Sequence, residues 1–256
     1  MNVCQRISTA LPVCASTTAG AVVLGMAGAA SASEATDADR TAQVVESATG
    51  TGAVARAPGK GVSVPPSAAG AVKARTADGG SVSIGLPQTK NVPGAKAGRG
   101  TTVYPGAAPS TDLAVQATPE GGVRALAVLK DKTAPREQRY AIGLPDGTRL
   151  VKAGTGAVAA VGRDGKVLGA FAAPWAKGAD GRELPTDYRI EGNVLVQSVQ
   201  TTGSTAFPVV ADPWYDPPRG KAGTPSSASP ARARTGRSTE LRAEPWPALR
   251  PSAPEP

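Results

Sequence analysis

Short apolar runs, separated by turn sequences, fill the middle of the chain from residue 81 to residue 212. Short apolar runs of this length, bounded by turn residues, are typical of β-strands. Asp-Gly and Gly-Gly pairs between the runs supply the positive φ angles that tight turns require. The strands predicted on this basis span residues 81–86, 101–104, 112–118, 123–129, 138–144, 148–152, 157–162, 166–172, 188–191, 194–199 and 206–210.

Two Asp-Gly pairs, at positions 146–147 and 164–165, predict hairpins over residues 140–150 and 157–168. Residues 123–130 also have the composition of a two-turn helix, because Ala and Leu favour helices. The shortness of this run and the glycines before it favour a strand. Short strands at regular spacing, without long helical periods, predict an all-β fold, either a single sandwich or an open barrel of short antiparallel strands.

The two flanking segments lack such patterns. Residues 33–80 are rich in Ala, Gly, Thr, Ser and Pro with no sustained period, so we predict a disordered spacer that buries too little apolar surface to fold. Residues 213–256 are rich in Pro, Arg, Ala and Ser, and proline at this density interrupts helices and sheets. We predict a disordered tail, and translation of high-GC DNA in a shifted frame is one origin of such a composition. The β-rich domain is then residues 81–212.

The first 32 residues have the pattern of a signal peptide. Arg6 precedes an apolar stretch over residues 19–30, and Ala30 and Ala32 are the small residues that signal cleavage requires. The predicted cut lies between Ala32 and Ser33. The stretch is shorter than the roughly 20 apolar residues of a membrane-spanning helix, so we expect no membrane anchor after cleavage. The predicted location is extracellular, in the medium or associated with the cell wall.

Composition excludes much of ordinary active-site chemistry from the mature protein. Cleavage would discard Cys4 and Cys14, the two cysteines of the chain, and the chain has no histidine. A Ser-His-Asp triad, a cysteine nucleophile and a zinc site of the usual nitrogen and sulfur type are therefore excluded. We predict no cofactor and no metal site.

Carboxylate pairs and serine–lysine chemistry remain as routes to catalysis. The candidate carboxylates are Asp146, Asp164, Asp180 and Asp187, and the first three precede a glycine. An aspartate in such a turn bonds the turn backbone, so turn formation is favoured over catalysis. We predict a non-enzymatic structural or binding module, with an envelope hydrolase that uses carboxylate or Ser/Lys chemistry as the alternative.

Charge and aromatic residues bear on partners. The formal net charge of +8 is spread thinly along the chain, whereas a nucleic-acid binder concentrates Lys and Arg on one face. Trp175, Trp214 and Tyr215 either form a surface that binds carbohydrate or peptide, or cover the open end of a sandwich. The second interpretation is favoured. The expected partner is a cell-wall polymer or another secreted protein, and no specific nucleic acid.

Short strings in the predicted domain resemble a known group of proteins. They are Asp112-Leu113-Ala114-Val115, Gly121-Gly122-Val123-Arg124, Pro174-Trp175-Ala176 and the closing string over residues 207–213. Together they resemble uncharacterised secreted proteins of high-GC actinobacteria and, more remotely, the β-rich region that precedes RHS/YD repeats in large wall-associated proteins. The resemblance covers about residues 100–214. It implies a secreted β-structural module and transfers no catalytic residue, and the absence of Tyr-Asp repeats argues against a toxin or delivery role.

Export has a direct test, because removal of residues 1–32 leaves a protein that begins at Ser33 and contains no thiol. Mass spectrometry of the exported protein should find the Ser33 terminus, and its migration on gels should be the same with and without reductant. Intact Met1 in the exported fraction would contradict the signal peptide.

Overall fold

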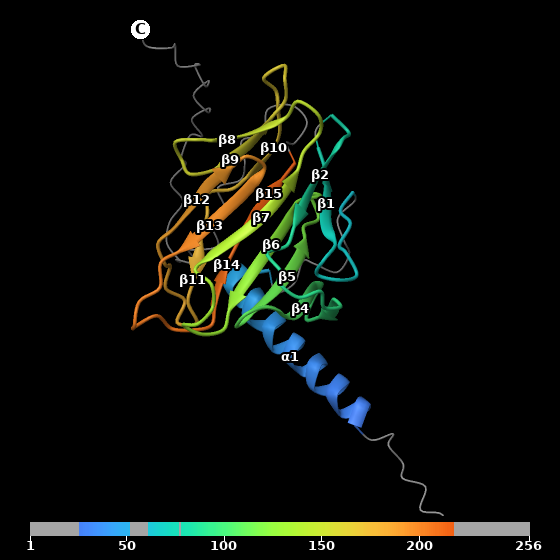
Figure 1. Ribbon diagram of the computed structural model, residues 1–256, viewed down its shortest axis with the longest axis vertical. Coiled ribbons are helices and arrows are strands. Elements are labelled where there is room, and N and C mark those ends of the chain that lie inside the picture. The colour runs from blue at the N-terminus through green and yellow to red at the C-terminus, as the bar shows by residue number, and fades with distance from the viewer. Residues whose placement is uncertain (1–25, 52–60, 77, 218–256) are drawn as a thin grey trace, which may run out of the picture.

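Apolar side chains face one another across two antiparallel sheets, which form an open sandwich with one helix on its outside (Figure 1). The computed structural model describes residues 26–51, 61–76 and 78–217. The sheets do not close into a barrel. The predicted all-β sandwich is therefore confirmed.

The smaller sheet has five strands in the order β1-β2-β7-β13-β12, and all its pairings are antiparallel. Buried and exposed residues alternate along these strands, most regularly along β7, so one face of the sheet is buried and the other is open. The strands are β1 (Ala71–Arg75), β2 (Ser81–Gly85), β7 (Glu137–Gly143), β12 (Thr186–Glu191) and β13 (Val194–Val199).

The larger sheet has ten strands. Eight follow the order β3-β4-β5-β6-β15-β10-β9-β8, and β14 pairs with both β6 and β11. The strands are β3 (Ala95–Ala97), β4 (Thr101–Ala108), β5 (Thr111–Ala117), β6 (Val123–Leu129), β8 (Arg149–Lys152), β9 (Val158–Val161), β10 (Val167–Phe171), β11 (Ala176–Lys177), β14 (Val209–Ala211) and β15 (Trp214–Asp216).

The main core lies between the two sheets and contains all four tyrosines of the chain. Each tyrosine is fully or almost fully buried, and Tyr215 packs against Phe171 with ring centroids 5.3 Å apart. Valine, leucine, isoleucine and alanine fill the rest of this layer. Each aromatic ring buries more apolar area than a valine or an alanine does, so these few residues contribute to the core out of proportion to their number.

The central strands β5 and β6 are buried along their whole length on both faces. One face contacts the smaller sheet, and the helix α1 (Met26–Thr49) packs on the other, against β3, β4, β5, β6 and β14. Ala38, Ala42, Val45 and Ala48 form the buried stripe of α1. The molecule therefore has three layers, and the first turns of α1 extend beyond the sheets (Figure 1).

The helix overturns the predicted spacer over residues 33–80. Buried positions 38, 41, 42, 45, 48 and 49 follow the helical spacing of three and four residues. Most of them are Ala or Thr, so the apolar stripe is too weak to stand out in an Ala-rich sequence. Gly50, with φ of 66°, ends the helix in the left-handed conformation that suits glycine.

Two buried carboxylates anchor α1 to the larger sheet. Asp112 of β5 accepts hydrogen bonds from the Thr41 hydroxyl at 2.7 Å and from the Gly106 amide at 2.7 Å, and it pairs with Lys130 Nζ at 2.7 Å. Glu46 of α1 accepts from the Arg99 amide at 2.6 Å. These charge-assisted bonds fix the position of the helix along the sheet.

The sandwich extends past both predicted domain boundaries. On the N-terminal side, Ser63 bridges Lys73 of β1, and the Tyr104 hydroxyl donates to the Pro65 carbonyl at 2.7 Å. On the C-terminal side, β15 lies between β6 and β10, so the domain does not end at residue 212. These segments bury backbone and single side chains, which leaves little periodic signal in the sequence.

Ten predicted strands coincide with or overlap strands of the structure, and residues 123–129 form β6, not a helix. The eleventh, residues 206–210, overlaps β14 in its last two residues. The hairpin over residues 157–168 is confirmed as β9 and β10. The hairpin over residues 140–150 is wrong, because β7 and β8 belong to different sheets. The turn at Gly147 carries the chain from one sheet to the other.

The predicted signal peptide and tail lie largely outside the described residues, since residues 1–25 and 218–256 are not described. Ala30, Ala32 and Ser33 fall within α1, and the packed part of the helix that the structure describes begins at Ala38. A cut after Ala32 would therefore keep that packed part. Within the described ranges, no helix combines the length and the hydropathy needed to cross a membrane.

The packing of α1 predicts unequal effects for two substitutions on the same helix. Val45→Ala should lower the free energy of unfolding by about 1–3 kcal/mol, because it leaves a cavity at a fully buried position. Gln43→Ala, at an exposed position, should change it by less than about 0.5 kcal/mol. Chemical denaturation measures both, and equal effects would mean that α1 does not pack as described.

Candidate functional site

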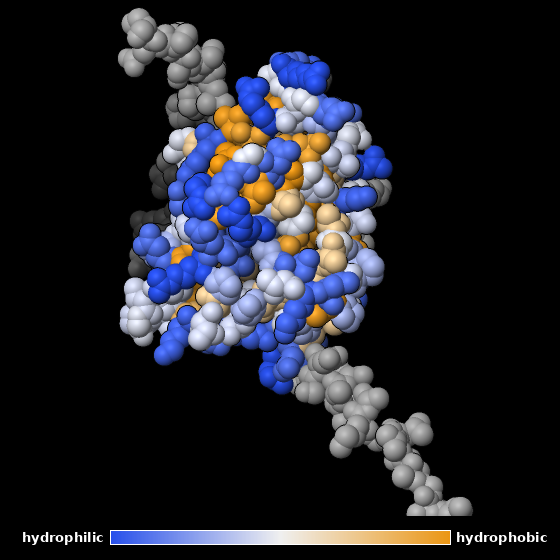
Figure 2. Space-filling model, viewed as in Figure 1, coloured by the Kyte–Doolittle hydropathy of each residue, from blue (hydrophilic) through white to orange (hydrophobic). Residues whose placement is uncertain are grey.

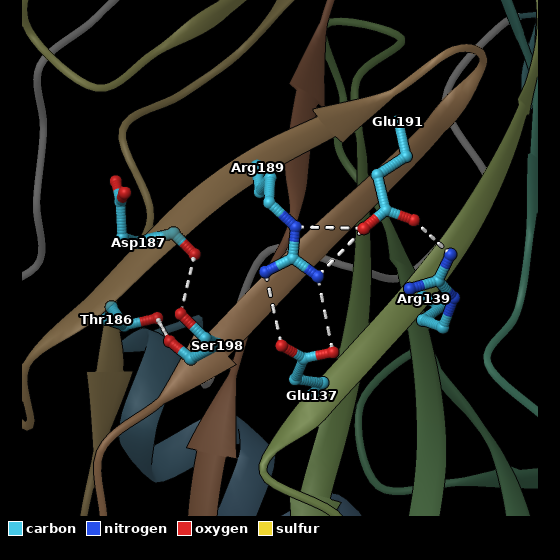
Figure 3. A network of polar contacts seen from close by, with 7 residues as sticks. All are labelled: Glu137, Arg139, Thr186, Asp187, Arg189, Glu191 and Ser198. Atoms are coloured by element: carbon cyan, nitrogen blue, oxygen red, sulfur yellow. Dashed lines mark hydrogen bonds and ion pairs between the residues drawn. The ribbon is translucent and has the colours of Figure 1, made fainter.

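Four charged side chains form a continuous ion-pair network on the outer face of the smaller sheet (Figure 3). Arg189 is the centre, because Nη1 and Nη2 reach the two oxygens of Glu137 at 3.2 and 3.4 Å and Nε donates to Glu191 at 2.9 Å. Arg139 pairs with the other oxygen of Glu191. We call Glu137, Arg139, Arg189 and Glu191 the ionic ladder.

Strand register brings the ladder together. Arg139 on β7 and Arg189 on β12 lie on either side of Val196 of β13. Residues two apart on a strand share a face, so Glu137 and Glu191 point outward with the arginines. The long side chains cross β13, and Val196 beneath them is fully buried.

The ladder is held electrostatically but contributes little stability. Hydrogen bonds to Glu137 and Glu191 raise the pKa of Arg189, and Arg139 and then Arg189 lower the pKa of Glu191. The four side chains are 38% to 52% exposed, and exposed ion pairs contribute only about 0–1 kcal/mol each. The main consequence is geometric, because four flexible side chains are fixed in one arrangement.

The outer face of the smaller sheet is open around the ladder. Figure 2 shows this face, with hydrophilic residues gathered over β12 and β13. The outward positions of the five strands include four basic and three acidic residues, so the face is close to neutral. They are Lys73, Arg75, Arg139 and Arg189, and Glu137, Asp187 and Glu191. Small residues occupy outward positions on β2 and β7, so few side-chain atoms project from that part of the face.

One edge of this face is closed by Lys152. Its Nζ lies 2.8 Å from each oxygen of Asp187 and donates to the Tyr188 carbonyl at 2.7 Å. Lys152 belongs to β8 and Asp187 to β12, so the contact joins the edges of the two sheets. Lys152 also lowers the pKa of Asp187.

The three aromatic residues that the sequence offered for binding do not form one exposed platform. Tyr215 is fully buried in the main core, which rules it out as a surface residue. Trp214 is half-buried, with the Arg124 guanidinium carbon 4.4 Å from its ring centroid and its Nε1 donating to Asp216 at 3.1 Å. Trp175 is half-buried against the cluster that α1 covers.

Asp212 lies at a place in the larger sheet where two neighbouring strands are both interrupted. β14 and β15 both pair with β6 but are separated by Asp212-Pro213, and the neighbouring β10 and β11 are separated by a segment that ends in Pro174-Trp175. Proline has no backbone N–H, so it cannot donate a hydrogen bond to a neighbouring strand. Oδ1 of Asp212 instead accepts from the Trp175 amide at 3.0 Å. The side chain thus satisfies a buried backbone donor at the interruption.

A shallow hollow lies where α1 meets β5 and β6, with a volume of about 270 Å³. Arg40, Val44 and Lys130 are among the residues that line it. The buried Asp112 at this place already bonds Thr41, Gly106 and Lys130. Its charge therefore serves the docking of α1, and the hollow offers no free buried acid or base.

Two of the three Asp-Gly carboxylates, Asp164 and Asp180, bond the turn backbone as predicted, and for Asp146 this stays a prediction. Asp164 accepts from the Lys166 amide and Asp180 from the Arg182 amide, both at 3.1 Å. Gly147, Gly165 and Gly181 all have positive φ. In the ranges that the structure describes, no group of three His, Cys, Asp or Glu residues is arranged to hold a metal ion.

Comparison with known proteins gives no match to a family model, to a curated protein or to a solved structure.

Sequence reasoning missed the ladder and the role of Asp212. The ladder has a signal, because charges recur with a period of two in Glu137-Gln-Arg139 and in Asp187-Tyr-Arg189-Ile-Glu191. Pairing these two strands across a third required the sheet order. Asp212 has no local signal beyond the proline that follows it.

Two buried tyrosines give a matched test of the core. Tyr104 donates to the Pro65 carbonyl, so Tyr104→Phe should cost about 1–2 kcal/mol of unfolding free energy by leaving that carbonyl unpaired. The Tyr140 hydroxyl has no partner among the described residues, so Tyr140→Phe should be neutral or slightly stabilising. Denaturation of the two variants distinguishes them, and a larger loss for Tyr140→Phe would contradict the packing.

Proposed function

We propose that this protein is a secreted, non-enzymatic β-sandwich module that binds a hydroxyl-rich polysaccharide of the cell envelope on the outer face of its smaller sheet. The observation that carries the proposal is the ionic ladder, an ordered row of polar groups on the outer face of the smaller sheet, away from the helix α1.

The chemistry of the ladder suits sugars. Guanidinium and carboxylate groups are planar and make paired hydrogen bonds, the first as donors and the second as acceptors. Neighbouring hydroxyls of a sugar both donate and accept, so a row of alternating charge can bond them in succession. The face is nearly balanced in charge, which favours a neutral polymer over a strongly anionic one.

Preorganisation supports the same conclusion. Binding usually costs about 0.5–1.5 kcal/mol for each long side chain that becomes immobile. In the ladder this cost is met on folding, because Arg189 is already held by Glu137 and Glu191. A partner that keeps these contacts needs to displace only water.

A hydrolase receives less support from the described residues. Asp164 and Asp180 bond turn amides, Asp187 pairs with Lys152, and Asp112 anchors α1. A catalytic pair needs two carboxylates held about 5–9 Å apart beside a space for substrate. The open sheet face matches binding better than catalysis.

Co-sedimentation with purified cell-wall sacculi tests the proposal through two matched variants. Arg189→Gln removes the centre of the ladder and should weaken binding at least about fivefold. Arg182→Gln removes the same charge from an exposed Asp180 pair in a turn and should leave binding unchanged. Both variants should unfold at the same midpoint as the wild type, because each loses only exposed ion pairs.

The charge of the remaining chain needs a control. Residues 219–255 include seven Lys and Arg against three Glu, so the assay is repeated at about 0.5 M salt, which screens exposed charges. Binding through the ladder should persist. Binding that disappears in salt, or that falls equally in both variants, would show that net charge and not the sheet face holds the polymer.

A further inference from the structure

Asp212 is a fully buried carboxyl at the junction between the two sheets. Its Oδ1 accepts from the Trp175 amide at 3.0 Å and from Gln197 Nε2 of β13 at 3.2 Å. Gln197 also donates to the Trp175 carbonyl at 3.1 Å. Asp212 lies between β14 and β15 of the larger sheet, and Gln197 lies on β13 of the smaller sheet. The two side chains therefore connect the sheets at the point where the strand is interrupted.

Four polar atoms at this junction have no hydrogen-bond partner among the described residues. They are Asp212 Oδ2, Gln197 Oε1 and the hydroxyls of Tyr140 and Tyr188. The two tyrosines come from β7 and β12, and each is coupled electrostatically to Asp212. No Lys or Arg of the described ranges forms an ion pair with this carboxyl, which distinguishes it from Asp112 with Lys130.

The protonation state of Asp212 decides how well this junction is satisfied. An ionised carboxylate that is buried without a cation is strongly disfavoured. The neutral acid keeps both acceptor bonds on Oδ1 and carries no buried charge. Burial accordingly raises the pKa of Asp212 to about 7, and the hydrogen bonds from the Trp175 amide and the Gln197 side chain oppose this only in part.

We propose that Asp212 is a built-in pH sensor: the neutral acid closes the two sheets at this junction, and its ionisation loosens the sandwich.

The groups that face Asp212 do not themselves titrate in the pH range in which Asp212 ionises. Burial, and to a lesser degree the charge of Asp212, raises the pKa of Tyr140 and Tyr188 well above the ordinary value, so both stay neutral. Arg124 on β6 interacts with Asp212 at longer range and keeps its charge. Trp175 and Gln197 do not titrate, and the chain has no histidine.

The direction of the effect follows from linkage. The folded-state pKa of Asp212 lies above the ordinary value of 3.8, so the folded protein holds a proton that the unfolded chain releases. The stabilisation is complete below the unfolded pKa and is lost as the pH rises through the folded pKa. Between about pH 4 and pH 7 the folding equilibrium constant should fall up to about tenfold for each pH unit.

Exposed carboxyls have the opposite sign and a different window. Hydrogen bonds or ion pairs lower the pKa of Asp78, Asp131, Asp164, Asp187 and Glu191. Their stabilisation is lost only as the pH falls below their ordinary values. Between about pH 5 and pH 8 these carboxyls therefore do not change the stability with pH, and the pH dependence in this range comes from Asp212.

Denaturant unfolding of the full chain across about pH 5 to pH 8 tests the sensor. Asp212→Asn can retain an acceptor for the Trp175 amide and removes the charge, so its stability should vary by less than about threefold in equilibrium constant where the wild type loses at least about tenfold. Asp180→Asn, an exposed turn residue, serves as the control and should follow the wild type. An Asp212→Asn profile parallel to the wild type would overturn the proposal.

A second measurement needs no variant. Calorimetric unfolding of the wild type at about pH 6, in buffers of different ionisation enthalpy, counts protons exchanged on unfolding. Release of close to one proton per molecule is the expected result. Release near zero, or uptake of protons, would contradict the sensor even if Asp212→Asn fails to fold.

Discussion

The burial of β5 and β6 on both faces is the constraint on which the rest of the structure depends. A sheet of this kind needs a cover on each side, and a second sheet alone supplies one. The smaller sheet brings the tyrosine-rich core, and α1 brings a stripe of small residues to the opposite face. Alanine and threonine on α1 let the helix lie close to the flat sheet, where larger side chains would hold it away. A weakly patterned segment thus becomes an essential layer of the molecule.

Buried polar side chains determine how these layers align, because apolar contacts are not directional. Asp112 and Glu46 fix the helix on the larger sheet through bonds of 2.6 to 2.7 Å to named donors. Asp212 and Gln197 do the same between the sheets, at the place where prolines interrupt the strands. The two kinds of junction differ in charge, since Asp112 has Lys130 beside it and Asp212 has no ion-pair partner in the described chain. An ionised Asp212 would therefore be a buried charge without a compensating cation.

The strands could be predicted from the sequence where alternation or turn chemistry was strong, as along β7 and around Gly165. The features that could not be predicted depend on residues in another part of the chain. α1 shows no strong pattern because its partners supply the larger apolar groups, Leu126 and Val128 among them. The Asp-Gly pair at position 146 predicts a turn correctly but cannot tell whether the next strand joins the same sheet. The ladder likewise needs three strands in a known order before its charges can be seen to meet.

The arrangement of layers also explains why the outer face of the smaller sheet takes no part in the described core. The core is held from the inner side of the smaller sheet, by Tyr140, Tyr188 and Gln197, and the helix covers the far side of the larger one. Residues on the outer face of β7, β12 and β13 therefore make few contacts that folding requires, and their exposed ion pairs add little stability. The proposed recognition of a polysaccharide would account for an ordered charge network at such positions. The same strands carry the ladder outward and two of the tyrosines around Asp212 inward, so a change in the protonation of Asp212 would act on the strands that hold the proposed binding face.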